Sequence, residues 1–286
     1  MIFKPHQFRI KRQVAIVVVL LFSVIQNTQA AKVDTVKTYS DAMHKTIKAV
    51  VITPDDYNPT KKYPVLYILH GYGGNYGGWV DDFPVVKPMA DQYNMIMVCA
   101  DGAVSSWYFD SPVDKSWKYE TYVTTELVGW IDKHYSTTQN KSGRAIMGLS
   151  MGGHGALYLT MKHQSVFGAA GSMSGGVDIR PFPNNWDISK RLGTLEQQPK
   201  NWEDNTVINL VGLLKPDNHP ALLIDCGTKD FFYNVNVAFH EKLLKNNISH
   251  DFTVRDGGHD VAYWSNSINY QLLFMHLFFE KGQANK

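Results

Sequence analysis

Short apolar runs alternate with longer amphipathic stretches from Lys45 to the end of the chain. The short runs are nearly all apolar, as in strands that are covered on both faces, and the longer stretches repeat apolar residues every three or four positions, as in helices. Strands are predicted at 46–53, 65–70, 95–100, 144–149, 169–174, 221–226 and 251–256, and helices at 86–93, 119–135, 153–163, 235–246 and 262–280. The alternation predicts an α/β fold, in which helices cover both faces of a mostly parallel central sheet.

Residues 178–218 follow neither pattern. They contain four prolines and two tryptophans without a sustained period. We interpret this stretch as an insertion over the edge of the sheet, partly helical around 200–214, of the kind that often shapes a binding site. No proline- or serine-rich linker divides the rest of the chain, so residues 31–286 are expected to form a single domain.

The first thirty residues are typical of a secretory signal peptide. Four basic residues precede an uncharged apolar run at 14–25, and small residues lead up to Ala30, after which cleavage is expected. The predicted location is therefore periplasmic or extracellular. An uncleaved anchor is the alternative, because the charge-free stretch 13–31 is just long enough to span a bilayer.

The composition narrows the class of protein. The 286 residues are 44% hydrophobic and 19% charged, which is typical of a compact globular protein and excludes disorder as the main state. Without the four basic residues of the signal, 24 of the 28 basic residues remain against 26 acidic ones, a net charge of about −2 with histidine neutral. No basic stripe remains after this processing, so nucleic acid is not an expected partner, and stable membrane insertion of the mature chain is not expected either.

The pentapeptide GLSMG at 148–152 is a GxSxG motif between a predicted strand and a predicted helix. In this context the turn forces its middle residue, Ser150, into a strained conformation and exposes the hydroxyl at the carboxyl edge of the sheet. The beginning of a helix also favours developing negative charge. Ser150 is therefore the predicted nucleophile.

A serine hydroxyl needs a base and a carboxylate before it acts as a nucleophile. Among the eleven histidines, His259 lies in the loop between the last predicted strand and the last helix, at the same edge as Ser150. Asp230 follows the strand 221–226 at this edge and gives the chain order serine, acid, histidine. Asp225 is the rival acid, although a strand residue should direct its side chain toward a helix layer.

The oxyanion that forms during acyl transfer needs two backbone donors. Met151 supplies one, because it directly follows Ser150. The loop after the strand 65–70 reads HGYGG at 70–74, where glycines allow the backbone to approach the reacting centre. The N–H of Tyr72 is the predicted second donor.

The segments HGYGG, GLSMGGHGA, CGTKD and GGHD, in this order, resemble the esterase D group of α/β-hydrolases over residues 45–280. That group includes S-formylglutathione hydrolases, tributyrin-type esterases and feruloyl esterases. The resemblance implies the α/β-hydrolase fold and hydrolysis of carboxylic esters through an acyl-serine intermediate, without metal or cofactor. It puts Ser150, Asp230 and His259 at the triad positions, and Tyr72 and Met151 at the oxyanion donors. The signal sequence separates this chain from the cytosolic formylglutathione enzymes.

The resemblance leaves alternatives open. Secreted mycolyltransferases share the layout, so acyl transfer to a carbohydrate is an alternative to hydrolysis, as are a general short-chain carboxylesterase and a non-catalytic binding module. The strand order of the group places the strands of Cys99 and Cys226 four positions apart, about 19 Å at roughly 4.8 Å per strand. A disulfide spans at most about 7 Å between Cα atoms, so both cysteines are expected to be free thiols.

Trp107 and Asp110, in the loop 101–111, and Trp264, five residues after His259, are the predicted substrate contacts. Trp186 in the insertion is a further candidate for stacking. This mixture of aromatic rings, hydroxyls and a carboxylate suits an aromatic acyl group or a sugar. Together with the export signal, it favours a hydroxycinnamoyl or acetyl ester on plant polysaccharide as the substrate, either as a small molecule or linked to the polymer.

Overall fold

The computed structural model describes residues 31–284. Within this range, eight strands form one sheet in the spatial order β1-β2-β4-β3-β5-β6-β7-β8. In chain order the strands are β1 (Lys32–Ser40), β2 (Lys45–Thr53), β3 (Val65–Leu69), β4 (Ile96–Ala100), β5 (Arg144–Leu149), β6 (Ala169–Met173), β7 (Ala221–Gly227) and β8 (Asp251–Arg255). Strand β2 is antiparallel to its neighbours β1 and β4. The remaining neighbours in the sheet, in the order β4-β3-β5-β6-β7-β8, are all parallel. The predicted α/β fold with a mostly parallel sheet is confirmed.

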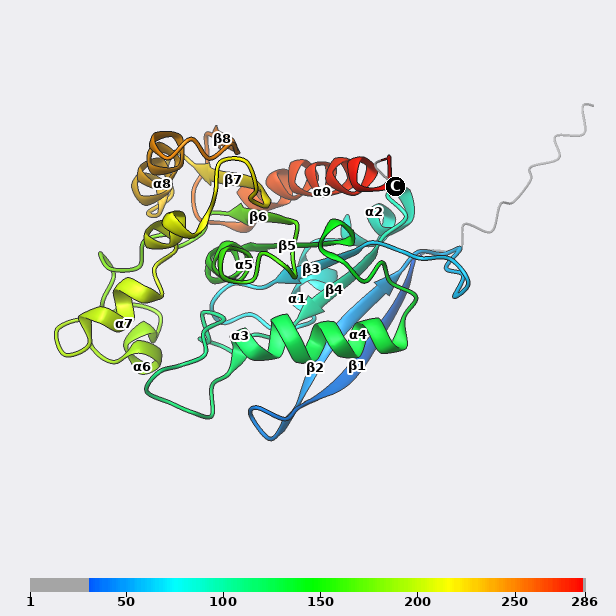
Figure 1. Ribbon diagram of the computed structural model, residues 1–286, viewed down its shortest axis with the longest axis horizontal. Coiled ribbons are helices and arrows are strands. Elements are labelled where there is room, and N and C mark those ends of the chain that lie inside the picture. Colours follow the sequence, from blue (N-terminus) through cyan, green and yellow to red (C-terminus); the bar gives the residue numbers. More distant parts are fainter. Residues whose placement is uncertain (1–30, 285–286) are drawn as a thin grey trace, which may run out of the picture.

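Helices cover both faces of the sheet (Figure 1). They are α1 (Gly78–Asp82), α2 (Val86–Gln92), α3 (Tyr119–Thr121), α4 (Val128–His134), α5 (Met151–Lys162), α6 (Ile188–Leu192), α7 (Pro199–Asp204), α8 (Tyr233–Lys245) and α9 (Val261–Ala284). A π-helical segment, Tyr122–Leu127, joins α3 to α4, and 3₁₀ turns lie at Lys141–Gly143 and Val207–Leu213.

Two apolar cores lie on opposite faces of the sheet, because alternate residues of a strand point to opposite sides. In β3, Tyr67 and Leu69 belong to the core beneath α4, α5 and α8, which we call the α5 core. Leu66 and Ile68 belong to the core beneath α2 and α9, which we call the α9 core. The near-continuous apolar runs in the sequence follow directly from burial on both faces.

The sequence pattern missed the first strand. In β1, exposed positions alternate with half-buried or buried ones, most of its residues are polar, and the strand has one neighbour, β2. An edge strand that faces solvent carries few apolar residues, so it lacks the continuous run by which the other strands were predicted. The five-residue helix α1 was missed as well, since it is too short to show a period.

The insertion at 178–218 is partly helical, as predicted. It contains α6, α7 and the 3₁₀ turn Val207–Leu213, which packs against α5 and α8. Trp202 of α7 is fully buried and its indole N–H donates to the carbonyl of Gly193 at 2.9 Å. The insertion is therefore anchored to the α5 core by its own aromatic residues.

The predicted signal peptide, residues 1–30, lies outside the described residues. Between residues 31 and 284, none of the helices combines the length and the apolar character needed to cross a membrane. Cys99 in β4 and Cys226 in β7 are buried free thiols, four positions apart in the sheet, as predicted.

Candidate active site

Ser150 lies in the turn that joins β5 directly to α5. Its backbone is left-handed, with φ 55° and ψ −118°, a conformation that costs energy for any residue with a side chain. The chain segments around this turn approach one another so closely that a Cβ on Gly152 would lie 2.2 Å from the carbonyl oxygen of Leu69, and one on Gly148 would lie 2.4 Å from the backbone of Gly152. The flanking glycines are thus required by the tight passage from strand to helix.

Three distant segments meet at the hydroxyl of Ser150. The Nε2 atom of His259 lies 2.9 Å from Oγ of Ser150, and its Nδ1 atom lies 2.9 Å from Oδ2 of Asp230. The other oxygen of Asp230 accepts the backbone N–H of Phe232 at 2.8 Å. The Asp230 side chain is fully buried, and that of His259 is 15% exposed. A carboxylate at Nδ1 holds the proton there, which leaves Nε2 as the acceptor for the serine hydroxyl.

The rival acid, Asp225, and the histidine nearest to Ser150 in the sequence take other partners. The carboxylate of Asp225 accepts from Arg255 at the end of β8 and from Tyr263 and Ser267 of α9. His154, four residues after Ser150, is fully buried in α5, and its Nδ1 atom lies 3.0 Å from the carbonyl of Gly176. Burial lowers the pKa of His154 to about 4, so its ring is neutral. Neither side chain reaches the hydroxyl of Ser150 in this arrangement.

The two residues predicted to supply the oxyanion donors are Met151, next to Ser150 in the chain, and Tyr72, in the loop after β3. Met151 is the first residue of α5, so its N–H has no acceptor within the helix. Tyr72 lines the same cavity as Ser150 and His259. The next amide in that loop, of Gly73, donates to the carbonyl of Val104 at 2.9 Å.

His70 holds the loop of Tyr72 in place, a role that the sequence did not specify. Its Nε2 atom accepts the N–H of Gly102 at 2.8 Å, and its Nδ1 atom lies 2.8 Å from the carbonyl of Gly71. The hydroxyl of Tyr108 donates to the carbonyl of His70 at 3.1 Å. The loop at 101–108 is therefore the support of the loop at 70–74, and the signal for this role is a histidine at the end of a strand followed by glycines.

A cavity of about 410 Å³ adjoins Ser150 and His259. Its aromatic lining comprises Tyr72, Trp79, Phe83, Trp186, Phe231 and Trp264. The ring of Trp264 is perpendicular to that of His259, with the centroids 4.9 Å apart, so this predicted contact residue does lie at the site. Sequence reasoning missed Trp79, Phe83 and Phe231. Their signal is proximity to a motif, since Phe231 directly follows Asp230, and Trp79 and Phe83 follow the HGYGG loop.

The structure corrects two predicted substrate contacts, Trp107 and Asp110. Trp107 is 1% exposed, and its indole N–H donates to the carbonyl of Trp186 at 3.1 Å. The carboxylate of Asp110 binds the N–H and the hydroxyl of Thr121 at 2.9 and 2.6 Å. Neither residue lines the cavity. Trp107 supports a wall from behind, because a buried indole N–H needs a hydrogen-bond acceptor, and Asp110 binds the first turn of a helix, because a short carboxylate readily accepts from nearby backbone N–H groups.

No metal centre is evident in the described part of the chain: residues 31–284 contain no group of three or more His, Cys, Asp or Glu side chains arranged to hold an ion.

The model of the Esterase family, described as "Putative esterase", matches residues 40–275 of the chain. The chain belongs to this family. The match covers β2 to most of α9, and with it all the segments that meet at Ser150. The predicted esterase class is thereby confirmed.

Individual relatives cover different shares of this esterase. An acetyl esterase of Caldicellulosiruptor saccharolyticus is 27% identical over 252 residues, which are 80% of this chain and 92% of the relative. An esterase of Mycobacterium tuberculosis is 35% identical over 136 residues, 46% of this chain but 29% of the relative, so this match spans less than a third of the longer protein. A diacylglycerol acyltransferase/mycolyltransferase of the same organism is 35% identical over 126 residues, 40% of this chain and 36% of the relative.

Solved structures agree with the fold. A ferulic acid esterase superposes with a TM-score of 0.76 at 30% identity, covering 87% of this chain and 98% of the other. An S-formylglutathione hydrolase of Staphylococcus aureus has a TM-score of 0.76 at 20% identity, covering 86% and 99% of the two chains. The resemblance to the esterase D group is confirmed, and the second neighbour supports the α/β-hydrolase fold alone.

Proposed function

We propose that this esterase hydrolyses carboxylic esters through an acyl-serine intermediate on Ser150. The observation that carries the proposal is the unbroken chain of hydrogen bonds from the Ser150 hydroxyl through the His259 imidazole to the buried Asp230 carboxylate. The Ser150 end of this series of hydrogen bonds lies at a cavity large enough for a small ester. Nucleophile, base and orienting acid are thus in place beside a binding space.

Each step uses groups of this chain. The Ser150 oxygen attacks the carbonyl carbon while its proton passes to Nε2 of His259, and the Asp230 carboxylate stabilises the resulting imidazolium. The amides of Tyr72 and Met151 donate to the oxyanion. The imidazolium then protonates the leaving alkoxide. A water molecule, deprotonated by the same nitrogen, then attacks the acyl carbon. The bond from this carbon to the Ser150 oxygen breaks, the imidazolium returns its proton to that oxygen, and the acid is released.

The favoured substrate is a hydroxycinnamoyl or acetyl ester on plant polysaccharide, and the enzyme acts outside the cytoplasm after removal of residues 1–30. The aromatic lining of the cavity supports an aromatic acyl group, as does the likeness to a ferulic acid esterase. The acetyl esterase relative supports the smaller acyl group. Export is testable by the mass of the protein recovered from outside the cell, which should begin at Ala31.

A fluorophosphonate probe tests the mechanism. It should label the wild-type protein and fail to label Ser150→Ala, while Ser142→Ala, at a half-buried serine in the 3₁₀ turn Lys141–Gly143, should label normally. Labelling of Ser150→Ala, or none of the wild type, would contradict the acyl-serine proposal. A panel of esters then tests the substrate: activity on short p-nitrophenyl esters with none on methyl ferulate would reject the hydroxycinnamoyl ester and favour a general short-chain carboxylesterase.

Acyl transfer to a sugar is the second candidate, favoured by the similarity to a diacylglycerol acyltransferase/mycolyltransferase. The same triad transfers the acyl group to a hydroxyl whenever an acceptor outcompetes water. Product analysis with and without trehalose or xylo-oligosaccharide separates the two reactions, because transfer yields a new ester and hydrolysis yields free acid only.

A further inference from the structure

The walls of the active-site cavity belong to the two different cores of the molecule. Trp79 and Phe83 are members of the α9 core, and they are 1% and 5% exposed. Trp186 packs against the α5 core on the other side of the sheet. Beside Trp186, Phe231 is 49% exposed, and Tyr72 of the loop at 70–74 is 40% exposed. An ester bound across Ser150 therefore has one enclosed end and one open end.

The chemistry of the leaving group decides which half of the ester lies at the open end. The alkoxide receives its proton from Nε2 of His259, so the alcohol must leave past this ring. The ring of Phe231 packs on the ring of His259, with the two centroids 4.2 Å apart. Trp186 stacks on Phe231, with the ring centroids 5.4 Å apart and an angle of 22° between the ring planes. This row of rings extends from the imidazole to the exposed rim. An alcohol attached to a polymer has to reach solvent, whereas an acyl group fits an enclosed space.

We infer that Trp186 and Phe231, with the hydroxyl of Tyr72, form a subsite that binds a sugar ring as the alcohol half of the ester. Aromatic faces pack against the C–H faces of a sugar, and polar groups beside them bind its hydroxyls. The Tyr72 hydroxyl and Oδ2 of Asp187 lie 3.5 Å apart at this rim, and the Asp187 side chain is 30% exposed. The inference rests on the proposed triad and names the class of its leaving group.

The backbone of this subsite is strained and is held in position by its surroundings. Trp186 and Asp187 are consecutive left-handed residues, with φ of 49° and 56°. Trp107 and Tyr108, in the supporting loop, are left-handed as well, at 52° and 60°. The hydrogen bond from the Trp107 indole to the Trp186 carbonyl joins the two strained turns. Such strain persists where the surroundings fix it, and a preformed surface loses less freedom when a ligand binds.

Two esters of one acid test the subsite: methyl ferulate and ferulate linked to an arabinoxylan oligosaccharide. Both esters give the same acyl-enzyme. Their reactions therefore differ only in the steps before and during departure of the alcohol. Phe231→Ala and Trp186→Ala should lower kcat/KM about five- to tenfold more for the sugar ester than for the methyl ester, mainly through KM, and Phe231→Tyr should restore most of the difference. Tyr39→Ala, an equally exposed aromatic change on β1, should leave the ratio of the two esters unchanged.

The possible outcomes separate the subsite from the mechanism. Equal losses on both esters, or a wild-type enzyme that cleaves only the methyl ester, would overturn the sugar subsite and leave the triad intact. A wild-type protein that cleaves neither ester and takes no fluorophosphonate label would overturn both. The labelling rate of each variant reports whether its triad is intact. Phe231→Ala alters an exposed side chain and therefore tests the subsite even if Trp186→Ala does not fold.

Discussion

Two regions of this esterase pair a histidine with a buried carboxylate, and they differ in what surrounds the pair. At the active site, His259 has Asp230 on one nitrogen and the Ser150 hydroxyl on the other. At the far end of α5, His163 binds Oε1 of Glu120 at 2.8 Å, and this ring is not part of the lining of the active-site cavity. Both pairs are joined to α5, which begins next to Ser150 and ends next to His163.

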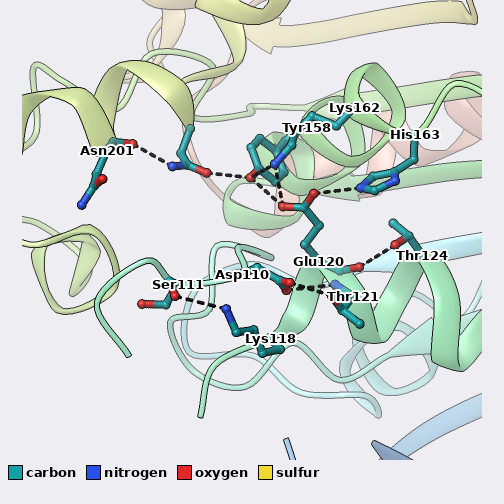
Figure 2. Close-up of polar contacts among 11 residues, drawn as sticks. Asp110, Ser111, Lys118, Glu120, Thr121, Thr124, Tyr158, Lys162, His163 and Asn201 are labelled. Carbon is teal, nitrogen blue, oxygen red and sulfur yellow. Dashed lines mark hydrogen bonds and ion pairs between the residues drawn. The ribbon is translucent and has the colours of Figure 1, made fainter. Parts of the chain in front are cut away.

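Figure 2 shows how completely the second carboxylate is bound. Oε2 of Glu120 accepts from Lys162 at 2.8 Å and from the Tyr158 hydroxyl at 2.7 Å, and that hydroxyl also lies 2.6 Å from Asn205, just beyond α7. Burial alone would raise the pKa of Glu120, but the hydrogen bonds from His163 and Lys162 outweigh it and lower the pKa to about 2. This network ties α3, α5 and the insertion together.

A histidine–carboxylate pair is therefore not by itself a catalytic feature. Glu120 is saturated by cationic and phenolic donors, so its histidine serves as one more structural donor. One oxygen of Asp230 accepts from a backbone amide, and the other binds His259. The second nitrogen of His259 is directed at a strained serine beside a cavity. What separates the two regions is the hydroxyl and the open space next to the ring.

The largest expected effect is that of Asp230→Asn on catalysis. The amide cannot hold the proton on Nδ1 of His259 as the carboxylate does, so kcat should fall about 10³- to 10⁴-fold with little change in thermal stability. Steady-state kinetics and thermal unfolding measure the two quantities. Asp256→Asn, an exposed carboxylate in the loop before His259, is the matched control and should retain full activity. A similar loss in both variants would contradict the role of Asp230.

Asp225→Asn should act on stability instead. It leaves the guanidinium of Arg255, which is 21% exposed, without its buried counter-charge, at a cost of about 3 kcal/mol in the free energy of unfolding. Urea unfolding measures this loss, and kcat at 25 °C should stay within a few-fold of the wild type. If Asp225→Asn abolished activity in a folded protein while Asp230→Asn did not, the assignment of the acid would be reversed.

Glu120→Gln tests the structural role of the second histidine–carboxylate pair. The variant removes the charge that Lys162 and His163 share, and because those two side chains are about one-third exposed, we expect a loss of about 2 kcal/mol in stability. Ester hydrolysis should be unchanged well below the unfolding temperature. Glu203→Gln, an exposed acid of α7, serves as the control. A drop in kcat without a loss of stability would show that this network does more than hold the fold.

The lowered pKa of Glu120 also predicts a pH dependence. Because the folded pKa lies near 2 against a usual 4.5, its contribution is complete above pH 4.5 and is lost as the pH falls toward 2. The free energy of unfolding should decrease by at most about 3 kcal/mol in total, and about 2 kcal/mol of this decrease should occur between pH 4.5 and pH 3. Denaturant unfolding of the wild type should show this decline, and Glu120→Gln should lack it. Parallel profiles for the two proteins would contradict the prediction.

The α/β architecture and the segments that carry Ser150, His259 and Asp230 could be predicted from the residue pattern alone. These features obey local rules: burial on both faces makes strands continuously apolar, and a strand that turns at once into a helix demands glycines around its serine. Packing in three dimensions was needed to show that Trp79, Phe83 and Phe231 form cavity walls, that Trp107 and Asp110 support loops, and that β1 completes the sheet edge. An aromatic ring in a loop looks the same in the chain whether it packs or faces a ligand, because only its neighbours in space, brought there by the fold, make that choice.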